Sequence, residues 1–407
     1  MKPQSVKASL ILKTGIMDTQ NTPIHVRLWD KHFWTLAIAN LLLVMSSYML
    51  IPAIPIQLRS DGYTMPQIAL VLGIFFVGMY LFGNSSAYLV QRYRRKMVFL
   101  LSTLLLLAVT AILYYLATMP NINIDYIFLV GLRFLQGSFY GLSQLVLLST
   151  LVIDNVEAVH RTEANHAVTW FGRFALALGP IVGLIVYHSM NFGSVLLVSC
   201  CCVLLSFVLV SFVRFPFRLP NEDLCRFSLD RFLLKGSYWL FINTTLITIV
   251  VGLLLTIEQT PRFYAFIMLG FILALLAERF AFSNADLRSE ATTGLLFMGG
   301  AVLLMLTRNQ SSVSYIAPIL TGFGVGIIGS RFLLFFIKLA GHCQRGTSQS
   351  TFILAWETGI GIGLVLSFAL LHCNRILVLW VSLIVLIISL IFYTFFVHKW
   401  YVKHKNR

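Results

Sequence analysis

Long apolar segments follow one another along almost the whole chain, and this pattern limits the possible folds more than any other feature of the sequence. Each segment is about 20 residues long, the length that an α-helix needs to cross roughly 30 Å of hydrocarbon. Hydrophobic residues make up 58% of the 407 residues and charged residues only 11%, so the chain is too apolar for a soluble domain. The segments predict an all-α integral membrane protein with twelve transmembrane helices, near residues 33–58, 65–90, 97–119, 126–150, 164–187, 193–213, 236–257, 262–280, 291–307, 314–338, 350–372 and 375–397.

The positions of the basic residues predict the orientation of these helices. The net charge of +15 could suggest a nucleic-acid partner, but the charged residues lie in short segments between the apolar runs, so we expect none. Most lysines and arginines lie in the two tails and in the connectors on the same side as the tails. Because connectors rich in basic residues stay in the cytoplasm, we expect both termini there. The opposite connectors hold only Arg59, Arg262, Arg308 and Arg375.

One hydrophilic connector inside the chain is much longer than the others and mixes acids, bases and prolines. Six predicted spans lie on either side of it, which suggests two bundles of six helices. Met17 is a second candidate for the start of translation. The predicted organisation is a cytoplasmic N-terminal tail (1–32), a first bundle (33–213), the cytoplasmic connector (214–235), a second bundle (236–397) and a basic cytoplasmic tail (398–407).

Corresponding residues in the fifth and eleventh spans suggest that the two bundles are repeats. In each span, an arginine at the start is followed twelve residues later by a charged residue and eighteen residues later by a glycine. The repeat predicts that a basic and an acidic residue lie at equivalent depths in the two bundles. The matched residues are Arg161, Arg173 and Gly179 in the first bundle and Arg345, Glu357 and Gly363 in the second.

Glu357 is the acid that lies deepest in a predicted span, roughly 13 Å inside at about 1.5 Å per residue. An ionised carboxyl at this depth is costly, so protonation and ion pairing are competing ways to neutralise it. Proton coupling needs a group that gains and loses a proton in this way. We interpret Glu357 as a proton-coupling residue; a permanent salt bridge or a hydrogen bond to a neighbouring helix is the alternative.

Polar residues inside the first and fourth spans are further candidates, because a buried charge in a membrane protein often marks an interior cavity. Arg133 recurs with Gly137 and Gly141 every four residues, so these three share one helix face. Gln136 lies at the edge of that face, and Asn40 lies within the first span. Arg133, Gln136 and Asn40 are candidates for a buried charge network or for solute binding.

Arg173 and Arg331 complete the set of candidates. Arg173 lies near the middle of the fifth span, seven residues before Pro180, which permits a bend. Gly179 and Gly183 belong to a neighbouring face of small residues that suits close helix packing. We expect Arg173 either to bind the solute or to be neutralised within its own bundle. Arg331 lies about two turns from the end of the tenth span, and we expect it either to bind the solute or to snorkel to the surface.

The sequence gives no sign of metal, cofactor or enzyme chemistry. The six cysteines form no CxxC pair, and the nine histidines form no ligand-like cluster. A phosphate-binding GxxxxGK[ST] loop is absent, so ATP hydrolysis by this chain is not expected. We expect no enzyme activity, no catalytic residue, no metal and no cofactor. No pattern indicates oligomerisation, and we expect a monomer.

Two motifs of the first bundle resemble those of the major facilitator superfamily. AYLVQRYRRK (residues 87–96) is similar to the family's loop motif after the second helix. Arg92, Arg95 and Lys96 match that motif, while Gln91 replaces its acid. RFLQGSFYG resembles the fourth-helix motif at Arg133, Gln136, Gly137 and Gly141.

Two further segments resemble exporters of the same family. ALALGPIVG is similar to the fifth-helix signature of exporters that exchange solute for protons, with matches at Gly179, Pro180 and Gly183. RGTSQSTFILAWETGIGIG resembles the eleventh helix of bacterial sugar-efflux and drug-efflux branches. The resemblance, which extends over residues 34–396, implies two pseudo-symmetric six-helix bundles. It also implies a solute cavity between them, lined mainly by the first, fourth, seventh and tenth helices, and alternating access.

The combined interpretation is a proton-coupled exporter of a small organic solute, working as an antiporter in the lipid bilayer of a bacterial inner membrane. A symporter or uniporter that imports a sugar, a nucleoside or an organic anion is the first alternative. The three arginines inside spans favour an anionic solute in that case. A non-transporting sensor or lipid-handling protein is the second alternative.

Overall fold

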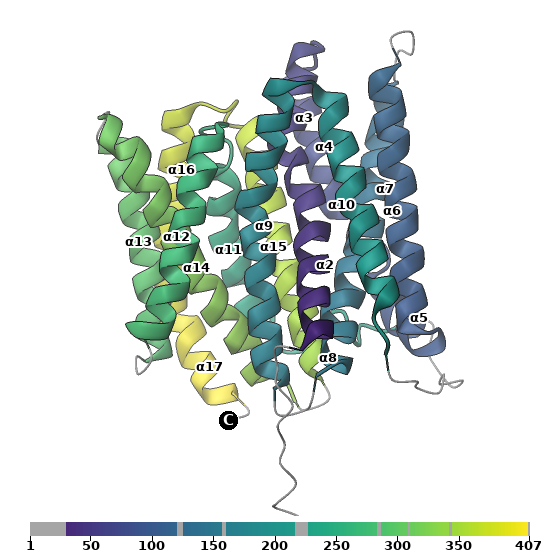
Figure 1. Cartoon of the computed structure of the whole chain (residues 1–407). Coiled ribbons are helices and arrows are strands. Elements are labelled where there is room, and N and C mark those ends of the chain that lie inside the picture. Colours follow the sequence, from purple (N-terminus) through teal and green to yellow (C-terminus); the bar gives the residue numbers. More distant parts are fainter. Residues whose placement is uncertain are drawn as a thin grey trace, which may run out of the picture.

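The computed structural model describes residues 30–119, 125–156, 160–215, 227–282, 286–307, 310–341 and 344–405, and the regular elements in these ranges are all helices. The helices stand roughly parallel to one another and form a bundle (Figure 1). The all-α prediction is confirmed. Residues 1–29 of the predicted N-terminal tail and residues 216–226 of the predicted connector lie outside the described residues.

The first half of the chain contains six spans, three of them divided into consecutive helical segments. The first span is α2 (Lys31–Tyr48) with α3 (Leu50–Ser60), and the second is α4 (Met65–Gly78) with α5 (Gly83–Arg92). The third is α6 (Arg95–Thr118), the fifth is α9 (Arg161–Ser189) and the sixth is α10 (Phe192–Phe212). The fourth consists of α7 (Tyr126–Val146), the π-helical turn η1 (Leu147–Leu151) and α8 (Val152–Asp154).

The second half repeats this plan. Its spans are α11 (Tyr238–Leu254), α12 (Pro261–Phe280), α13 (Leu287–Thr307), α14 (Ser311–Leu339), α15 (Arg345–Ala369) and α16 (Arg375–Phe392), the last continued by η3 (Tyr393–Val397) and α17 (His398–His404). Eleven spans within the described residues are long and apolar enough to cross a membrane, and α11 is a shorter apolar helix of 17 residues. Helical turns extend α11 to Ile257, whose N–H donates to the Leu254 carbonyl at 3.2 Å. Each predicted span therefore corresponds to a helix.

The helices of the two halves pair in the same way. In the first half, α2 packs on α9 and α10, α7 packs on α4 and α6, and α6 packs on α10. In the second half, α11 packs on α15 and α16, α14 packs on α12 and α13, and α13 packs on α16. Each pair in one half becomes a pair in the other when every span number is shifted by six. The predicted pseudo-symmetric six-helix bundles are confirmed.

The most extensive contacts between the halves are those of α4 with α15 and of α9 with α12. The rotation that exchanges the halves also exchanges these two contacts, because it converts spans two and eleven into spans eight and five. The interface therefore obeys the same pseudo-twofold symmetry as the bundles. Small residues allow α4 and α15 to approach closely, since Gly361 of α15 lies directly against the Phe76 ring of α4.

Both described ends of the chain lie at the same end of the bundle, the lower end in Figure 1. We call this the terminal end. The helix of the last span runs on to His404, although residues 398–407 were expected to form a tail. At the opposite end, polar side chains cap helices of even-numbered spans, so backbone N–H groups at these helix starts have side-chain acceptors. Thr64 and Gln67 form a capping box, and Asp125, Asn191, Thr260 and Asn374 accept from backbone N–H groups.

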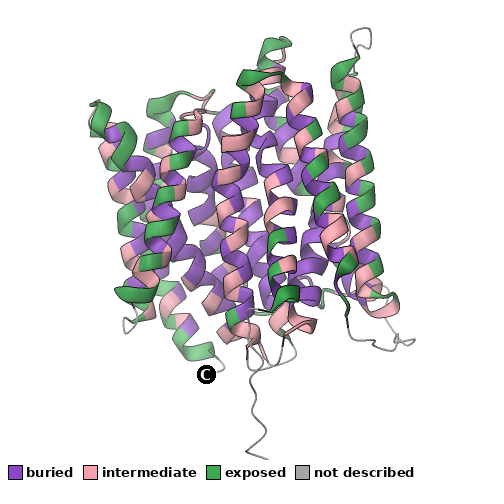
Figure 2. Ribbon diagram, viewed as in Figure 1, coloured by how far each residue is buried: buried purple, intermediate pink, exposed green. Residues whose placement is uncertain are grey.

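Burial follows the pattern of a protein in lipid. Buried residues gather in the centre of the bundle, and exposed residues lie on its outer surface (Figure 2). Many of the exposed residues are large and apolar; Ile127 is 76% exposed, Phe212 is 78% exposed and Phe396 is 66% exposed. A surface this apolar is unfavourable in water and is stable against hydrocarbon.

The described end of the predicted connector packs between the two halves at the terminal end. Phe232 is buried against Gly83 at the start of α5. The Leu234 N–H donates to the Thr351 hydroxyl of α15 at 2.8 Å, and the Arg231 N–H donates to the Thr347 hydroxyl at 3.2 Å. This segment therefore ties the second span to the start of the eleventh.

Candidate binding site between the two halves

Two small cavities lie where the first, second, fourth and fifth spans meet α15. The larger measures about 40 Å³ and the smaller about 10 Å³, and Tyr48 and Glu357 line both. Such a space holds a few water molecules at most, so an organic solute requires the halves to move apart. The polar residues that line the larger cavity are Asn40, Tyr48, Gln144, Thr169, Arg173 and Glu357.

The helices around these cavities differ in part from those that the family resemblance implied. The first and fourth spans contribute as expected. The described residues that line the cavities include none from the seventh or tenth span, and the fifth and eleventh spans take their place. The reason is the close packing of α15 on both α4 and α11, which brings the face of α15 that carries Glu357 into the gap between the halves.

Glu357 is a buried carboxyl at the boundary between the halves. Its side chain is only 4% exposed, and its Oε1 accepts a hydrogen bond from the Tyr48 hydroxyl of α2 at 3.0 Å. The ion pairs found among the described residues do not include Glu357. A buried carboxylate with hydrogen bonds but no cation is costly, so its neutral, protonated form is comparatively favoured.

Arg173 lies on α9 and lines the same cavity. It is 4% exposed, and its Nη1 donates to the Gly326 carbonyl at 3.2 Å and to the Ser330 hydroxyl at 2.7 Å, both on α14. Its guanidinium carbon lies 4.4 Å from the centre of the Trp170 ring. The polar contacts of Arg173 therefore cross to the other half. The alternative interpretation of this residue had expected neutralisation within its own bundle. Arg173 and Glu357 meet at one cavity.

Arg133 and Gln136 form a polar contact inside the first half. Arg133 is 3% exposed; its Nη1 donates to the Gln136 side-chain oxygen and its Nε to the Val71 carbonyl at 3.4 Å. Gln136 in turn donates to the Thr110 hydroxyl at 3.2 Å. The Phe75 ring packs under the guanidinium at 4.8 Å. Arg133 lines the smaller cavity, whereas Arg173 lines the larger one.

Asn40 lies on α2 and lines the larger cavity. Its amide nitrogen donates to the Val168 carbonyl of α9 at 3.2 Å, and its side chain is fully buried. This bond fixes the orientation of the amide, so the amide oxygen has no hydrogen-bond partner within the described part of the chain. The first and fifth spans are thereby joined next to Arg173.

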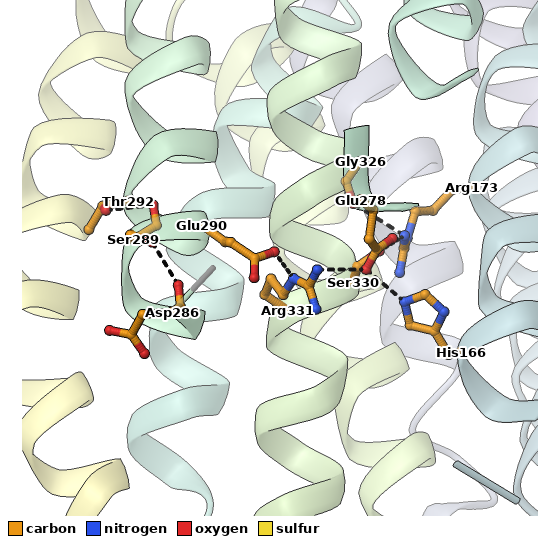
Figure 3. A network of polar contacts seen from close by, with 10 residues as sticks. All are labelled: His166, Arg173, Glu278, Asp286, Ser289, Glu290, Thr292, Gly326, Ser330 and Arg331. Atoms are coloured by element: carbon orange, nitrogen blue, oxygen red, sulfur yellow. Dashed lines mark hydrogen bonds and ion pairs between the residues drawn. The ribbon is translucent and has the colours of Figure 1, made fainter. Parts of the chain in front are cut away.

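Arg331 takes part in an ion-pair network of the second half (Figure 3). Its Nη2 lies 3.2 Å from Glu278 Oε1 on α12, and its Nε pairs with Glu290 on α13. Arg331 is not among the described residues that line the two cavities. Its charge is balanced by these two acids, and a role of Arg331 in solute binding stays a prediction.

The same network reaches across to the first half through Glu278. His166 of α9 lies 3.1 Å from Glu278 Oε1, and the Ser330 hydroxyl donates to Glu278 Oε2 at 3.2 Å. Because Ser330 also accepts from Arg173, one chain of polar contacts runs from the cavity to His166 at the α9–α12 contact (Figure 3).

The motif glycines lie at close helix contacts. Gly137 and Gly141 of α7 face the backbone of α4 at Phe75 and Met79, where a Cβ atom would overlap it. Gly179 and Gly183 of α9 face the first span at Met49, between α2 and α3, with similarly short distances. Pro180 lies inside the continuous helix α9 between them. The small residues let the first and fifth spans, and the second and fourth, approach closely enough to enclose the cavities.

The basic residues after the second span bind within the first half. Arg95 pairs with Asp154 of α8, and Lys96 donates to the Ser211 and Val213 carbonyls at the end of α10 at 2.6 and 2.9 Å. Arg92 lies in the last turn of α5. Gln91 occupies the position of the family's acid, and Asp154 of the fourth span supplies a carboxylate to this region.

Larger pockets elsewhere in the molecule do not fit a solute pathway. A pocket of about 490 Å³ lies within the first half alone, lined by Ile54, Asp61, Leu113 and Arg133 among others. A second of about 700 Å³ lies within the second half, beside Leu303 and Arg375. Relative movement of the halves does not expose a pocket to both sides of the membrane when one half alone surrounds it.

The described residues contain no group of three or more His, Cys, Asp or Glu side chains that could hold a metal ion. The described cysteines, Cys200, Cys201, Cys202 and Cys373, are free thiols. Cys225 and Cys343 lie outside the described residues.

Several residues of the site were missed by the sequence reasoning. Tyr48 is one of them. Asn40, Val44 and Tyr48 recur every four residues, so they share the helix face that lines the cavity, and this spacing could have indicated Tyr48. Gln144 lies after the residues of the predicted Arg133 face, and its spacing from them does not indicate a role in the site. The His166–Glu278 contact depends on the packing of α9 against α12, which a single sequence does not reveal.

The architecture described above is that of a multi-pass membrane protein with a polar site enclosed between two repeated halves. The sequence pattern of the Major Facilitator Superfamily matches residues 36–283, more than half of the chain, and the chain therefore belongs to that family. The protein is a secondary transporter. Among curated protein sequences, none matches the chain.

Solved structures give the same fold. The chain is similar to the crystal structure of the human organic anion transporter MFSD10 (TETRAN), with a TM-score of 0.68 over 88% of this chain and 98% of that chain. The two sequences are 12% identical, so the likeness concerns the fold alone.

Proposed function

We propose that the protein is a proton-coupled exporter, which exchanges a small organic solute for protons. The position of Glu357 carries the proposal. Its carboxyl is buried, lines the cavity between the halves and accepts a hydrogen bond from Tyr48 of the other half. A carboxyl in this setting is neutralised by a proton when no solute is bound.

Exchange is favoured over co-transport because the carboxyl itself lines the cavity. A solute group that donates a hydrogen bond to Glu357 binds the ionised carboxylate more strongly than the neutral carboxyl, so protonation weakens solute binding. Proton and solute therefore compete for the same oxygen atoms. Protonation also weakens the bond that Glu357 accepts from Tyr48, since hydrogen bonds to ionised groups are the stronger ones. The protonation state is thereby linked to the contact between the halves.

Import of an organic anion together with protons is the second candidate. Arg173 favours it, because this buried guanidinium lines the cavity and keeps two nitrogen atoms without a hydrogen-bond partner. The human structure that shares the fold is described as an organic anion transporter, which is compatible with such a solute.

We propose that the protein lies in a bacterial inner membrane with its terminal end on the cytoplasmic side. We also propose that it works as a monomer. The basic residues of the terminal-end connectors support this orientation, as Arg95 and Lys96 illustrate.

The test uses purified protein in proteoliposomes that contain a pH-sensitive dye and carry an imposed pH gradient. Separate pools of sugars, organic anions and organic cations are added to the outside. We expect one pool to dissipate the gradient with wild-type protein, and this activity to be lost in Glu357→Gln and retained in Glu357→Asp. Glu163→Gln, which removes a carboxyl whose side chain is 60% exposed, is the matched control and keeps wild-type activity. Equal proton movement by wild type and Glu357→Gln would overturn the proposal.

A further inference from the structure

The three arginines inside the spans differ in how far their donors are used. Arg133 donates to Gln136 and to the Val71 carbonyl, and Arg331 pairs with Glu278 and Glu290. Arg173 uses only Nη1 among the described residues, where its Nε and Nη2 have no hydrogen-bond partner although both are buried. A buried donor without an acceptor costs about 1–3 kcal/mol, so these two atoms call for a partner.

The unused atoms of Arg173 form one edge of the guanidinium group. Nε and Nη2 point in the same direction, and this edge matches the two oxygens of a carboxylate. Gly329 of α14 lies beside it, and a Cβ atom at that position would come within 2.8 Å of Nε. The glycine therefore leaves the space that the guanidinium group occupies, and a side chain at this position would displace it. Arg173 also lines the larger cavity, so an acceptor that arrives with a solute can reach it.

Unused acceptors lie on other walls of the same cavity. The side-chain oxygens of Asn40 and Gln144 are buried and have no hydrogen-bond partner among the residues that the structure describes. For Asn40 the bond from its nitrogen to the Val168 carbonyl fixes the oxygen as the open group. Glu357 adds a carboxyl whose Oε1 accepts from Tyr48. A solute that satisfies this part of the cavity must supply hydrogen-bond donors.

We infer that the transported solute is a hydroxylated organic anion, whose carboxylate binds the Nε–Nη2 edge of Arg173 and whose hydroxyl groups donate to Asn40, Gln144 and Glu357. The inference rests on the proposed function in one respect, namely that this cavity is the solute site. A solute with only apolar and cationic groups would leave the Arg173 edge unpaired. A neutral sugar would satisfy the acceptors and lack the paired oxygens that this edge fits.

The test compares three hydroxylated six-carbon probes that differ in charge: gluconate, which is an anion, glucose, which is neutral, and glucosamine, which is a cation. Trp170 stacks on Arg173 and Trp356 lines the cavity, so intrinsic tryptophan fluorescence of the purified protein reports binding. We expect gluconate to bind about tenfold or more tightly than glucose, and glucosamine to bind most weakly, since charge-assisted hydrogen bonds contribute about 1.5–3 kcal/mol.

Two variants of Arg173 test the assignment of the anion site. Arg173→Gln should weaken gluconate binding about tenfold or more and leave glucose binding nearly unchanged. Arg173→Lys keeps the charge but lacks the paired donors, and it should weaken gluconate binding as well. If Arg173→Gln does not give a monodisperse protein, Arg173→Lys alone decides. Arg262→Gln, which removes an exposed arginine at the start of α12, is the control and should bind gluconate as the wild type does.

Three outcomes would overturn the inference: binding of none of the three probes, tightest binding of glucosamine, or unchanged gluconate affinity in both Arg173 variants. The proposed function fails by a different result. If gluconate binds through Arg173 but its transport moves no protons, the solute class stands and proton coupling falls. If a pool of organic cations moves protons through Glu357, proton coupling stands and the inferred solute class is wrong.

Discussion

The Tyr48 hydroxyl of α2 donates a hydrogen bond of 3.0 Å to the Glu357 carboxyl of α15, and this bond joins the two halves of the transporter at the lining of its central cavity. The two residues are 309 positions apart in the chain. The bond gives Glu357 a partner that depends on its protonation state, because an ionised carboxylate accepts more strongly than a neutral carboxyl.

Removal of this bond should change the pH dependence of transport. In Tyr48→Phe the ionised form of Glu357 loses a donor, so the protonated form persists to higher pH. We expect the midpoint of the transport–pH profile to move to higher pH, measured as initial rates in proteoliposomes. Tyr80→Phe is the matched control, since the Tyr80 hydroxyl contacts Thr358 across the same boundary. An identical midpoint in Tyr48→Phe and wild type would show that the bond does not act on the proton-binding group.

The close contact between α7 and α4 predicts a loss of stability in Gly137→Ala. The added Cβ overlaps the Phe75 backbone, and overpacking of this kind costs about 1–3 kcal/mol. The melting temperature of the solubilised protein should fall. Gly131→Ala on the same helix is the control, because nothing lies within 4 Å of a Cβ there. Equal melting temperatures for the two variants would contradict the close packing of these helices.

The ion pairs of Arg331 predict a structural role for this residue. Arg331→Gln leaves the buried Glu290 and the half-buried Glu278 without their shared cation, which should cost about 3 kcal/mol. The double variant Arg331→Gln with Glu290→Gln should recover part of that loss, as measured by thermal unfolding. A role in solute binding would instead appear as a weakened solute affinity at unchanged stability.

The His166–Glu278 contact predicts an effect on access from the terminal end. His166→Ala removes a 3.1 Å contact between α9 and α12, so the open state at this end should become about 2–10 times more populated. The rate at which a maleimide labels Ser348→Cys reports this change, because Ser348 is buried near the start of α15. The background is a chain with its native cysteines replaced by serine. His160→Ala is the control, since His160 contacts Glu163 of its own half. Equal labelling rates in both variants would remove His166 from the contact that closes this end.

The fold could be predicted from the sequence because each span carries its own signal. A run of about 20 apolar residues needs no partner to be recognised as a membrane helix. The repeated spacing from Arg173 and Glu357 to the glycines that follow them also has a counterpart in the structure. Gly179 packs on α2 and Gly363 packs on α11, which are the first spans of the two halves.

The partners of the buried groups could not be predicted in the same way. A hydrogen bond such as that between Tyr48 and Glu357 depends on how two distant helices face each other, and periodicity within one helix does not contain this information. Arg331 illustrates the difficulty: its depth in the span was visible in the sequence, whereas its pairing with Glu290 arises from the packing of α13 on α14. The unpaired edge of Arg173 likewise depends on Gly329 of another span.

The most direct test of the central claim compares two transport modes of Glu357→Gln in proteoliposomes, with the compound that dissipates the pH gradient in wild type as the labelled solute. If Glu357 carries the exchanged proton, the variant still exchanges labelled for unlabelled solute at equal pH on both sides. It no longer accumulates solute when a pH gradient is imposed. Accumulation at the wild-type level by Glu357→Gln would contradict the account, because the gradient would then act without this carboxyl.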